Sequence, residues 1–154
     1  MIRKLAILIL LIGLVSIVIG AVFTSQGIAK NNYLVTAMRQ EKITLGIPSD
    51  KIAEGEIIDN AKEAQIAGDT VREHRHTISP TYGDLLGGKQ FDTTDPEQLI
   101  YAQALNLENY LYLAVLGFGL TQVVIASGIF MVITGFALGG TGLALFRLGR
   151  LSQS

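Results

Sequence analysis

The sequence has no cysteine and no tryptophan, and charged residues make up only 16% of its 154 positions. The lack of cysteine excludes disulfides, iron–sulfur clusters and thiolate zinc sites. Charge is also missing from two long stretches, residues 5–29 and 111–146, which contain no Asp, Glu, Lys or Arg. Because a soluble domain rarely contains two such stretches, this distribution indicates a membrane protein.

The charged residues that are present are segregated by sign. All 13 acidic residues lie between Glu41 and Glu108. The two ends of the chain, by contrast, carry four basic residues and no acid: Arg3, Lys4, Arg147 and Arg150. This is no basic patch of the kind that binds nucleic acid, so we expect no nucleic-acid partner.

Residues 5–23, LAILILLIGLVSIVIGAVF, are long enough to cross the ~30 Å hydrocarbon core as one helix. The basic residues Arg3 and Lys4 before them would also suit a secretory signal peptide. However, the apolar run exceeds the usual ~7–15 residues of such a peptide, and its one passable cleavage site is Gly27-Ile28-Ala29. We therefore expect an uncleaved transmembrane helix over residues 5–23.

The second uncharged stretch is too long for one crossing and lacks a polar loop for two. A single tilted helix over residues 111–138 fits it best. We expect the glycine-rich residues 139–142 to end this helix, so that residues 139–154 form a short tail at the membrane interface.

Two crossings place both ends of the chain on the same side of the membrane. Short flanks rich in Lys and Arg stay in the cytoplasm, so residues 1–4 and 139–154 are predicted to be cytoplasmic. Residues 24–110 are then extracytoplasmic. The fold class predicted from this layout is an all-α membrane protein: a hairpin of two transmembrane helices with a helical stalk and a small extracytoplasmic helical cap.

Small residues form faces on both predicted membrane helices, one face on the first helix and two on the second. These faces comprise Gly13, Ser16 and Gly20; Gly117 with Thr121; and Gly135 with Gly139. Small side chains let helix backbones approach closely, which is how helices associate in lipid. The faces predict either packing of the two helices within one chain, or association with a second copy or another integral membrane protein.

Gln122 is the most polar side chain within either predicted membrane helix. Polar groups in lipid seek hydrogen-bond partners, so we expect Gln122 to bond across to Ser16 or to Thr121. Neither helix contains Asp, Glu, Lys, Arg or His, which argues against a proton relay or an ion-coupled transporter.

The external segment is predicted to be helical as well. Thr94-Asp95-Pro96-Glu97 has the capping residue, the proline and the acid of a helix start. We expect the second helix to begin near Pro96, with a buried stripe of Ile100, Ala104, Leu107 and Leu111. The first helix is expected to extend to about Glu41.

Between these extensions, Lys42–Leu45 is a possible short strand. An Ala-rich amphipathic helix is predicted over Ala53–His76, from the spacing of its apolar and small residues Ile58, Ala61, Ala64 or Gln65, Gly68 and Val71. Residues 77–94 contain Pro80, Gly83, Gly87 and Gly88 and are predicted to be a loop.

His74 and His76 are the only histidines. On a helix, residues two apart point about 200° apart, so these two side chains cannot share a metal ion there. We interpret them as solvated residues near a helix end. No phosphate loop, dinucleotide fingerprint or nucleophile motif is present, so we expect no catalytic residue, cofactor or metal.

Several short segments carry a resemblance to known proteins. They are Glu41–Thr44, the external helix ending in Glu73-His74, Thr81–Asp84, Asp95-Pro96, and Ala104 with Asn106 before the second span. The chain resembles a group of small two-span bacterial membrane proteins that often carry the automatic label "aromatic ring-opening dioxygenase LigA". The resemblance implies the two-span layout. The dioxygenase label is not transferred, because two histidines do not supply the iron site that such an enzyme needs.

Three functional hypotheses follow. The first is a non-enzymatic membrane protein, either an accessory or structural subunit of a bacterial envelope complex or a self-assembling scaffold. Its partners would be the lipid bilayer and either a second copy or another integral membrane protein. The second is an extracytoplasmic binding or sensing module. The third, a metal-dependent enzyme that uses His74 and His76, would require metal in the purified protein.

Overall fold

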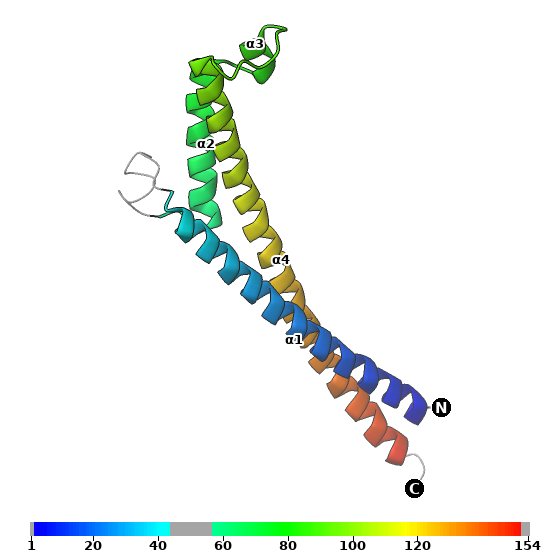
Figure 1. Cartoon of the computed structure of the whole chain (residues 1–154). Coiled ribbons are helices and arrows are strands. Elements are labelled where there is room, and N and C mark those ends of the chain that lie inside the picture. The colour runs from blue at the N-terminus through cyan, green and yellow to red at the C-terminus, as the bar shows by residue number, and fades with distance from the viewer. Residues whose placement is uncertain (1, 44–56, 152–154) are drawn as a thin grey trace. The chain divides into compact units, whose positions relative to one another are not determined.

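A computed structural model describes residues 2–43 and 57–151. Within these residues the chain is helical and contains no strand (Figure 1). The helices are α1 (Ile2–Glu41), α2 (Ala61–Ile78), α3 (Tyr82–Leu86) and α4 (Pro96–Leu151). The predicted all-helical fold is therefore confirmed in its coarse form: two long apolar helices that pack together, with shorter helices between them. The possible strand over Lys42–Leu45 and the start of the helix predicted over Ala53–His76 extend outside the described residues. Within the described residues that helix begins later than predicted, because residues 57–60 are not helical and α2 runs over Ala61–Ile78.

The chain divides into two compact units. The first, which we call the hairpin unit, comprises Met1–Asn31 and Leu120–Ser154. The second, which we call the cap unit, comprises Asn32–Gly119. Both α1 and α4 contribute to each unit, and the units are described separately below.

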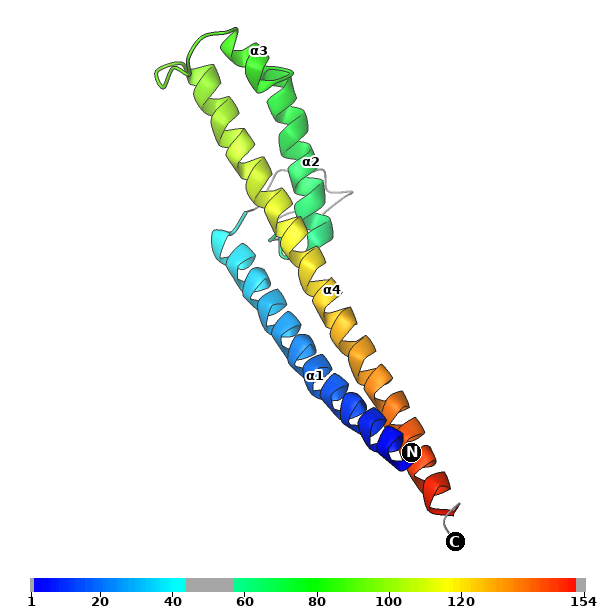
Figure 2. The ribbon, with the colours of Figure 1, turned by 90° about the vertical axis from the view of Figure 1, so that its right-hand side faces the viewer.

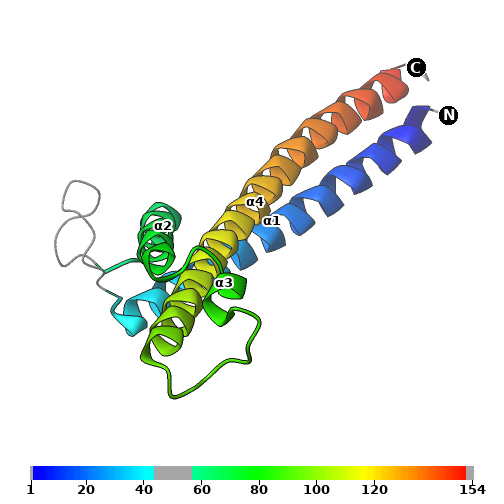
Figure 3. The ribbon, with the colours of Figure 1, turned by 90° about the horizontal axis from the view of Figure 1, so that it is seen from above.

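In the hairpin unit, α1 and α4 run side by side in opposite directions. Figures 2 and 3 show the N-terminus and the C-terminus at the same end of this helix pair. Both helices are long and apolar enough to span a membrane. The side chains that point away from the pair are mostly Leu, Ile, Val and Phe, and many of them are about half exposed or more.

The predicted helix break at residues 139–142 is wrong. α4 continues without interruption through Gly139, Gly140 and Gly142 to Leu151. The residues beyond Gly139 are paired with the start of α1: a side chain added at Gly142 would lie 2.7 Å from Leu10 Cγ. Glycine weakens a helix mainly in water, where the exposed backbone has other partners, and packing against a neighbouring helix offsets that cost.

In the cap unit, α2 packs against α4 and the end of α1 around a small apolar core. The buried members are Met38, Ile58, Ala64, Ala67, Val71, Leu111, Ala114 and Phe118. Three of these, Ile58, Ala64 and Val71, belong to the face predicted for the external helix. The core is small, as the scarcity of large apolar residues in this part of the sequence suggests.

Two helices of the cap unit begin directly after a residue whose side chain caps the first turn. The Asn60 side chain accepts a hydrogen bond from the Glu63 backbone N–H (3.0 Å), and Asp95 Oδ1 accepts one from Glu97 (2.9 Å). Each of these satisfies a backbone donor that the first turn of a helix leaves free. The predicted start of the second helix near Pro96 and the predicted end of the first near Glu41 are both confirmed.

Two details of the cap unit differ from the sequence prediction. The segment predicted as loop contains the short helix α3, capped by Thr81 and ended by Gly87 in the left-handed conformation (φ 53°) that favours glycine. Of the predicted stripe on α4, Leu111 is buried and Ala104 and Leu107 pack against the core, as expected. Only its first residue differs: Ile100 is 55% exposed, whereas the adjacent Tyr101 is fully buried. The neighbour that decides this face is Arg75 on α2, which sequence periodicity alone does not show.

Candidate functional site

The two helices of the hairpin unit meet along small residues, seven glycines and one alanine, that recur every seven residues. On α1 the positions are Ala6, Gly13, Gly20 and Gly27, and on α4 they are Gly128, Gly135, Gly142 and Gly149. We call these eight residues the glycine interface. A seven-residue repeat keeps one face of each helix turned toward a partner when the two helices wind around each other with a left-handed twist.

Backbone contacts backbone along this interface. A Cβ atom added at Gly20 would lie 2.6 Å from Gly128 O, and one added at Gly135 would lie 2.7 Å from Gly13 O. Real Cβ atoms essentially never come that close, so no side chain larger than hydrogen fits these positions without moving a helix. Glycine is therefore required here by the close approach of the two helices rather than by backbone torsion.

The contacts define an antiparallel register. Gly13 faces Gly135, Gly20 faces Gly128, and Gly27 lies beside Thr121 and Ile125. A step of seven residues toward the C-terminus of α1 thus corresponds to a step of seven residues toward the N-terminus of α4. The uncharged stretch of α1, residues 5–29, consequently lies against an uncharged stretch of α4 along its whole length.

Two polar contacts accompany the glycines. The Ser16 hydroxyl donates a hydrogen bond to the Met131 carbonyl (2.8 Å), and the Thr121 hydroxyl donates one to Asn31 Oδ1 (3.2 Å). Each joins α1 to α4. In a setting without water, such bonds satisfy polar groups that would otherwise be left without partners.

Of the seven residues selected from the sequence, four lie directly in this helix pairing: Gly13, Ser16, Gly20 and Gly135. Gly139 contacts α1 only through its backbone. Its backbone N lies 3.0 Å from a Cβ added at Gly13, yet a Cβ added at Gly139 itself would meet nothing within 4 Å.

The other two selected residues lie elsewhere. Gly117 belongs to the cap unit, where a Cβ added to it would lie 3.1 Å from the Leu34 side chain. Gln122 is exposed on α4, and the contact between helices predicted for it is made by its neighbour Thr121. Sequence reasoning missed Gly27, Gly128, Gly142 and Gly149, although their seven-residue spacing was visible in the sequence.

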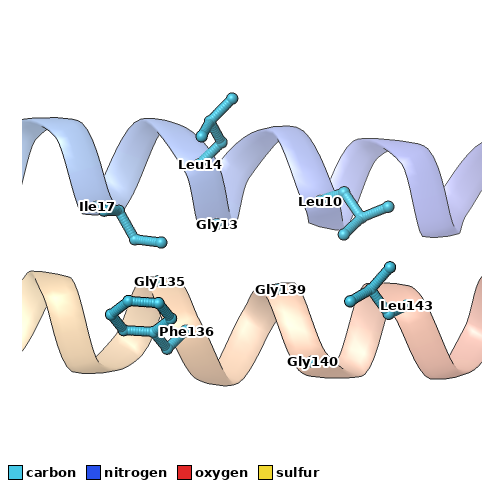
Figure 4. Close-up of a pocket in the computed structure, with 9 residues that line it drawn as sticks. All are labelled: Leu10, Gly13, Leu14, Ile17, Gly135, Phe136, Gly139, Gly140 and Leu143. Carbon is cyan, nitrogen blue, oxygen red and sulfur yellow. The ribbon is translucent and has the colours of Figure 1, made fainter.

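Beside the glycine interface lies an open apolar groove of about 270 Å³ (Figure 4). It is lined by α1 residues Leu10, Gly13, Leu14 and Ile17, and by α4 residues Gly135, Phe136, Gly139, Gly140 and Leu143. Because Gly139 and Gly140 have no side chains, the outer surface is hollowed where α4 would otherwise carry bulk. We call this hollow the Gly139 groove.

The cap unit contains a buried ion pair that the sequence analysis also missed. Arg75 Nε lies 2.7 Å from Glu108 Oε2, and the two side chains are only 9% and 8% exposed. Arg75 also donates to the Tyr101 hydroxyl, and its guanidinium lies 4.8 Å from the centre of the Tyr101 ring. The hydrogen bond that Arg75 donates to Glu108 raises the pKa of Arg75 above its ordinary value, although burial opposes this.

The residues considered for catalysis form no comparable cluster. His74 and His76 are both exposed on α2, and no group of three potential metal ligands occurs within the described residues. His76 Nε2 lies 3.3 Å from the Arg75 guanidinium. Nothing in this arrangement activates a nucleophile or a water molecule.

The comparisons with known proteins give no assignment: no family model, curated protein or solved structure matches the chain. The glycine interface, the Gly139 groove and the buried ion pair must therefore be interpreted on physical grounds.

Proposed function

We propose that the chain is a non-enzymatic integral membrane protein whose hairpin unit anchors the cap unit outside the cytoplasm. In this role it would serve as an accessory or structural subunit of a bacterial envelope complex, or as a self-assembling scaffold. The carrying observation is the distribution of side chains in the hairpin unit.

In that unit the buried positions are glycine, alanine and threonine, and Ser16 is half-buried, while the exposed positions carry many of the large apolar side chains. In water this arrangement would be unfavourable, because burial of large apolar side chains drives folding. In lipid the outward side chains are solvated by acyl chains, and close backbone packing holds the helices together. The arrangement therefore supports membrane insertion.

The cap unit suggests where the second crossing begins. Leu111, Ala114 and Phe118 are buried in the core of the cap unit, and the Tyr112 hydroxyl donates a hydrogen bond to Asp69 (2.7 Å). A helix with charged residues on its surface would be costly to place in hydrocarbon. We therefore shift the predicted second crossing from residues 111–138 to residues 120–146; in the register of the glycine interface, residues 120–143 of it lie opposite residues 5–28 of α1.

Orientation follows from charge. The basic residues at the ends of the chain favour a cytoplasmic location for both ends, so the cap unit would be extracytoplasmic. The test combines alkaline washing of membranes with the labelling of single cysteines, which is clean because the chain has none of its own.

We expect the protein to stay in alkali-washed membranes. Lys89→Cys should react with an impermeant thiol reagent in intact cells, and a cysteine added behind Ser154 should react only after cell lysis. Ile133→Cys, which lies within the proposed crossing, should resist the reagent under both conditions. Release by alkali, or labelling of the added cysteine in intact cells, would contradict the proposal.

The scaffold and subunit hypotheses differ in what occupies the outer face of the hairpin unit. Native mass spectrometry of the protein in mild detergent distinguishes them, because a scaffold is recovered as a defined oligomer and a subunit with another membrane protein. Recovery only as a lone chain would argue against both hypotheses.

One observation favours the second candidate function, a binding or sensing module. The cap unit has a hollow of about 340 Å³, lined by Glu41, Ile43, Gln103, Asn106, Leu107 and Tyr110. If it binds a small molecule, a ligand that stabilises the wild type in a thermal-shift screen should not stabilise Leu107→Trp, which fills the hollow. Equal stabilisation of both proteins would remove this candidate.

A further inference from the structure

Two arginines contact one aromatic ring at the end of the hairpin unit where α1 begins and α4 ends. The Arg3 guanidinium lies 5.5 Å from the centre of the Phe146 ring, and the Arg150 guanidinium lies 5.0 Å from it. The two arginines come from different helices, and both are exposed. Two like charges from different helices thus lie at one ring, with Lys4 and Arg147 nearby in the sequence.

The hairpin unit offers these cations no carboxylate side chain. Every Asp and Glu of the sequence lies between Glu41 and Glu108, in the cap unit. Two guanidinium groups that contact the same ring repel each other, and an anion bound near both relieves that repulsion. Arginine suits phosphate in particular, because its planar fork can donate two parallel hydrogen bonds to phosphate oxygens.

The Gly139 groove leads toward this charged end. Leu143 lines the groove, Phe146 and Arg147 follow it three and four residues later, and Arg150 follows one turn after that. Residues at this spacing are neighbours on one helix surface. On α1, Leu10 in the groove lies two turns from Arg3. The apolar Gly139 groove and the two arginines therefore lie one after the other along the same pair of helices.

We propose that this end of the hairpin unit binds one anionic phospholipid, with its phosphate between Arg3 and Arg150 and an acyl chain in the Gly139 groove. The inference rests on the proposed membrane location. Charge complementarity selects an anionic headgroup, and the groove selects a lipid over a soluble anion, because inorganic phosphate would leave the apolar hollow unused. A cytoplasmic leaflet that contains anionic lipid would supply the ligand where the basic residues favour placing this end.

The test uses the full chain purified in mild detergent and titrated with phosphatidylglycerol or phosphatidylcholine of identical acyl chains. Native mass spectrometry measures the fraction of protein that carries lipid. We expect the wild type to prefer phosphatidylglycerol. In Arg3→Gln/Arg150→Gln the affinity for phosphatidylglycerol should fall on the order of tenfold, while phosphatidylcholine binding should stay unchanged.

The matched control is Lys30→Gln/Lys89→Gln, which also removes two exposed positive charges but leaves Phe146 and its arginines intact. Its phosphatidylglycerol affinity should equal that of the wild type. An equal loss in both double variants, or no headgroup preference in the wild type, would overturn the proposal.

The groove is tested separately by Gly140→Leu. A Cβ added at Gly140 meets nothing within 4 Å, so this side chain should occupy the groove without disturbing the helix pair. We expect several-fold weaker phosphatidylglycerol binding and an unchanged melting temperature without lipid. Gly119→Leu, at another open position of α4 outside the groove, is the control and should bind lipid normally. Unaltered binding by Gly140→Leu would overturn the assignment of the acyl chain.

Two further measurements distinguish a failure of the lipid-binding proposal from a failure of the proposed function. If inorganic phosphate raised the melting temperature as much as phosphatidylglycerol does, the site would take a free anion and the lipid proposal would be wrong. If alkali released the protein from membranes, the proposed function would fail together with this inference. Retention in alkali-washed membranes without any headgroup preference would overturn this inference alone.

Discussion

At the scale of single residues, Arg75 has the most demanding environment in the cap unit. Its guanidinium, on α2, is buried against Glu108 and the Tyr101 hydroxyl, both on α4. Arg75 and Glu108 are 33 positions apart in the sequence. A buried ion pair contributes little net stability compared with apolar packing, but the loss of one partner leaves the other charge buried and alone. This asymmetry makes the pair testable.

We predict that Arg75→Ala lowers the free energy of unfolding of the cap unit by about 3–5 kcal/mol. Arg75→Met/Glu108→Leu should recover most of that loss, because it removes both charges and keeps apolar volume. The measurement is hydrogen exchange of the α2 amides in the full chain. Arg72→Ala is the control: its pair with Asp69 is exposed, so an effect below about 1 kcal/mol is expected. Equal effects of Arg75→Ala and Arg72→Ala would contradict this interpretation.

At the scale of the helices, the glycine interface separates positions that look alike in the sequence. Gly135 and Gly139 form one small-residue pair four residues apart, and nothing in the sequence pattern distinguishes them. In the structure a Cβ at Gly135 would collide with the backbone of α1, whereas a Cβ at Gly139 points into open space.

We therefore predict opposite outcomes for the two positions. Gly135→Leu should destabilise the hairpin unit by about 1–3 kcal/mol or more, because the helices must separate to admit the side chain. Gly139→Leu should leave it unchanged or stabilise it by up to about 1 kcal/mol through better helix propensity.

The readout is the rate of disulfide formation in a Ser16→Cys/Met131→Cys background, together with thermal melting in detergent. Equal behaviour of the two variants would show that the register is wrong. If Gly139→Leu instead dissolved an oligomer without affecting the disulfide, the outer face of α4 would be the contact with a second copy.

Much of the helix layout could be predicted from the sequence. The helix start at Pro96 depends on local capping by Asp95, and the length of α1 depends on an unbroken helical pattern, so both are local properties. The continuation of α4 through Gly139–Gly142 could not be predicted from local propensity, because α1 packs against this segment and supports it. The Arg75–Glu108 pair depends on the alignment of α2 with α4, which no local pattern specifies.

At the scale of the whole molecule, each of the two units is stabilised by a different kind of internal packing. The cap unit buries apolar side chains, as a soluble domain does, while the hairpin unit joins backbones through glycine. All five tyrosines lie within Asn32–Gly119, so tyrosine fluorescence reports on the cap unit alone.

We predict that urea added to the protein in detergent micelles unfolds the units at different concentrations. The tyrosine signal should change first, because urea weakens the burial of apolar groups from water. Most of the far-ultraviolet ellipticity should persist beyond that point, because the micelle shields the helices of the hairpin unit. The check is to record both signals in one titration. Coincident transitions would indicate a single cooperative body and contradict the division into two units.

The glycine interface has a consequence for the effect of temperature. Separation of two helices that touch through backbone exposes little new apolar surface to water when lipid covers the remainder. The heat capacity change that bends the stability curve of soluble proteins arises from such exposure. The pairing of α1 with α4 should therefore weaken almost linearly on warming and should not fail in the cold. An anchor of this kind would keep its geometry over a wide range of growth temperatures, limited by the fluidity of the surrounding lipid.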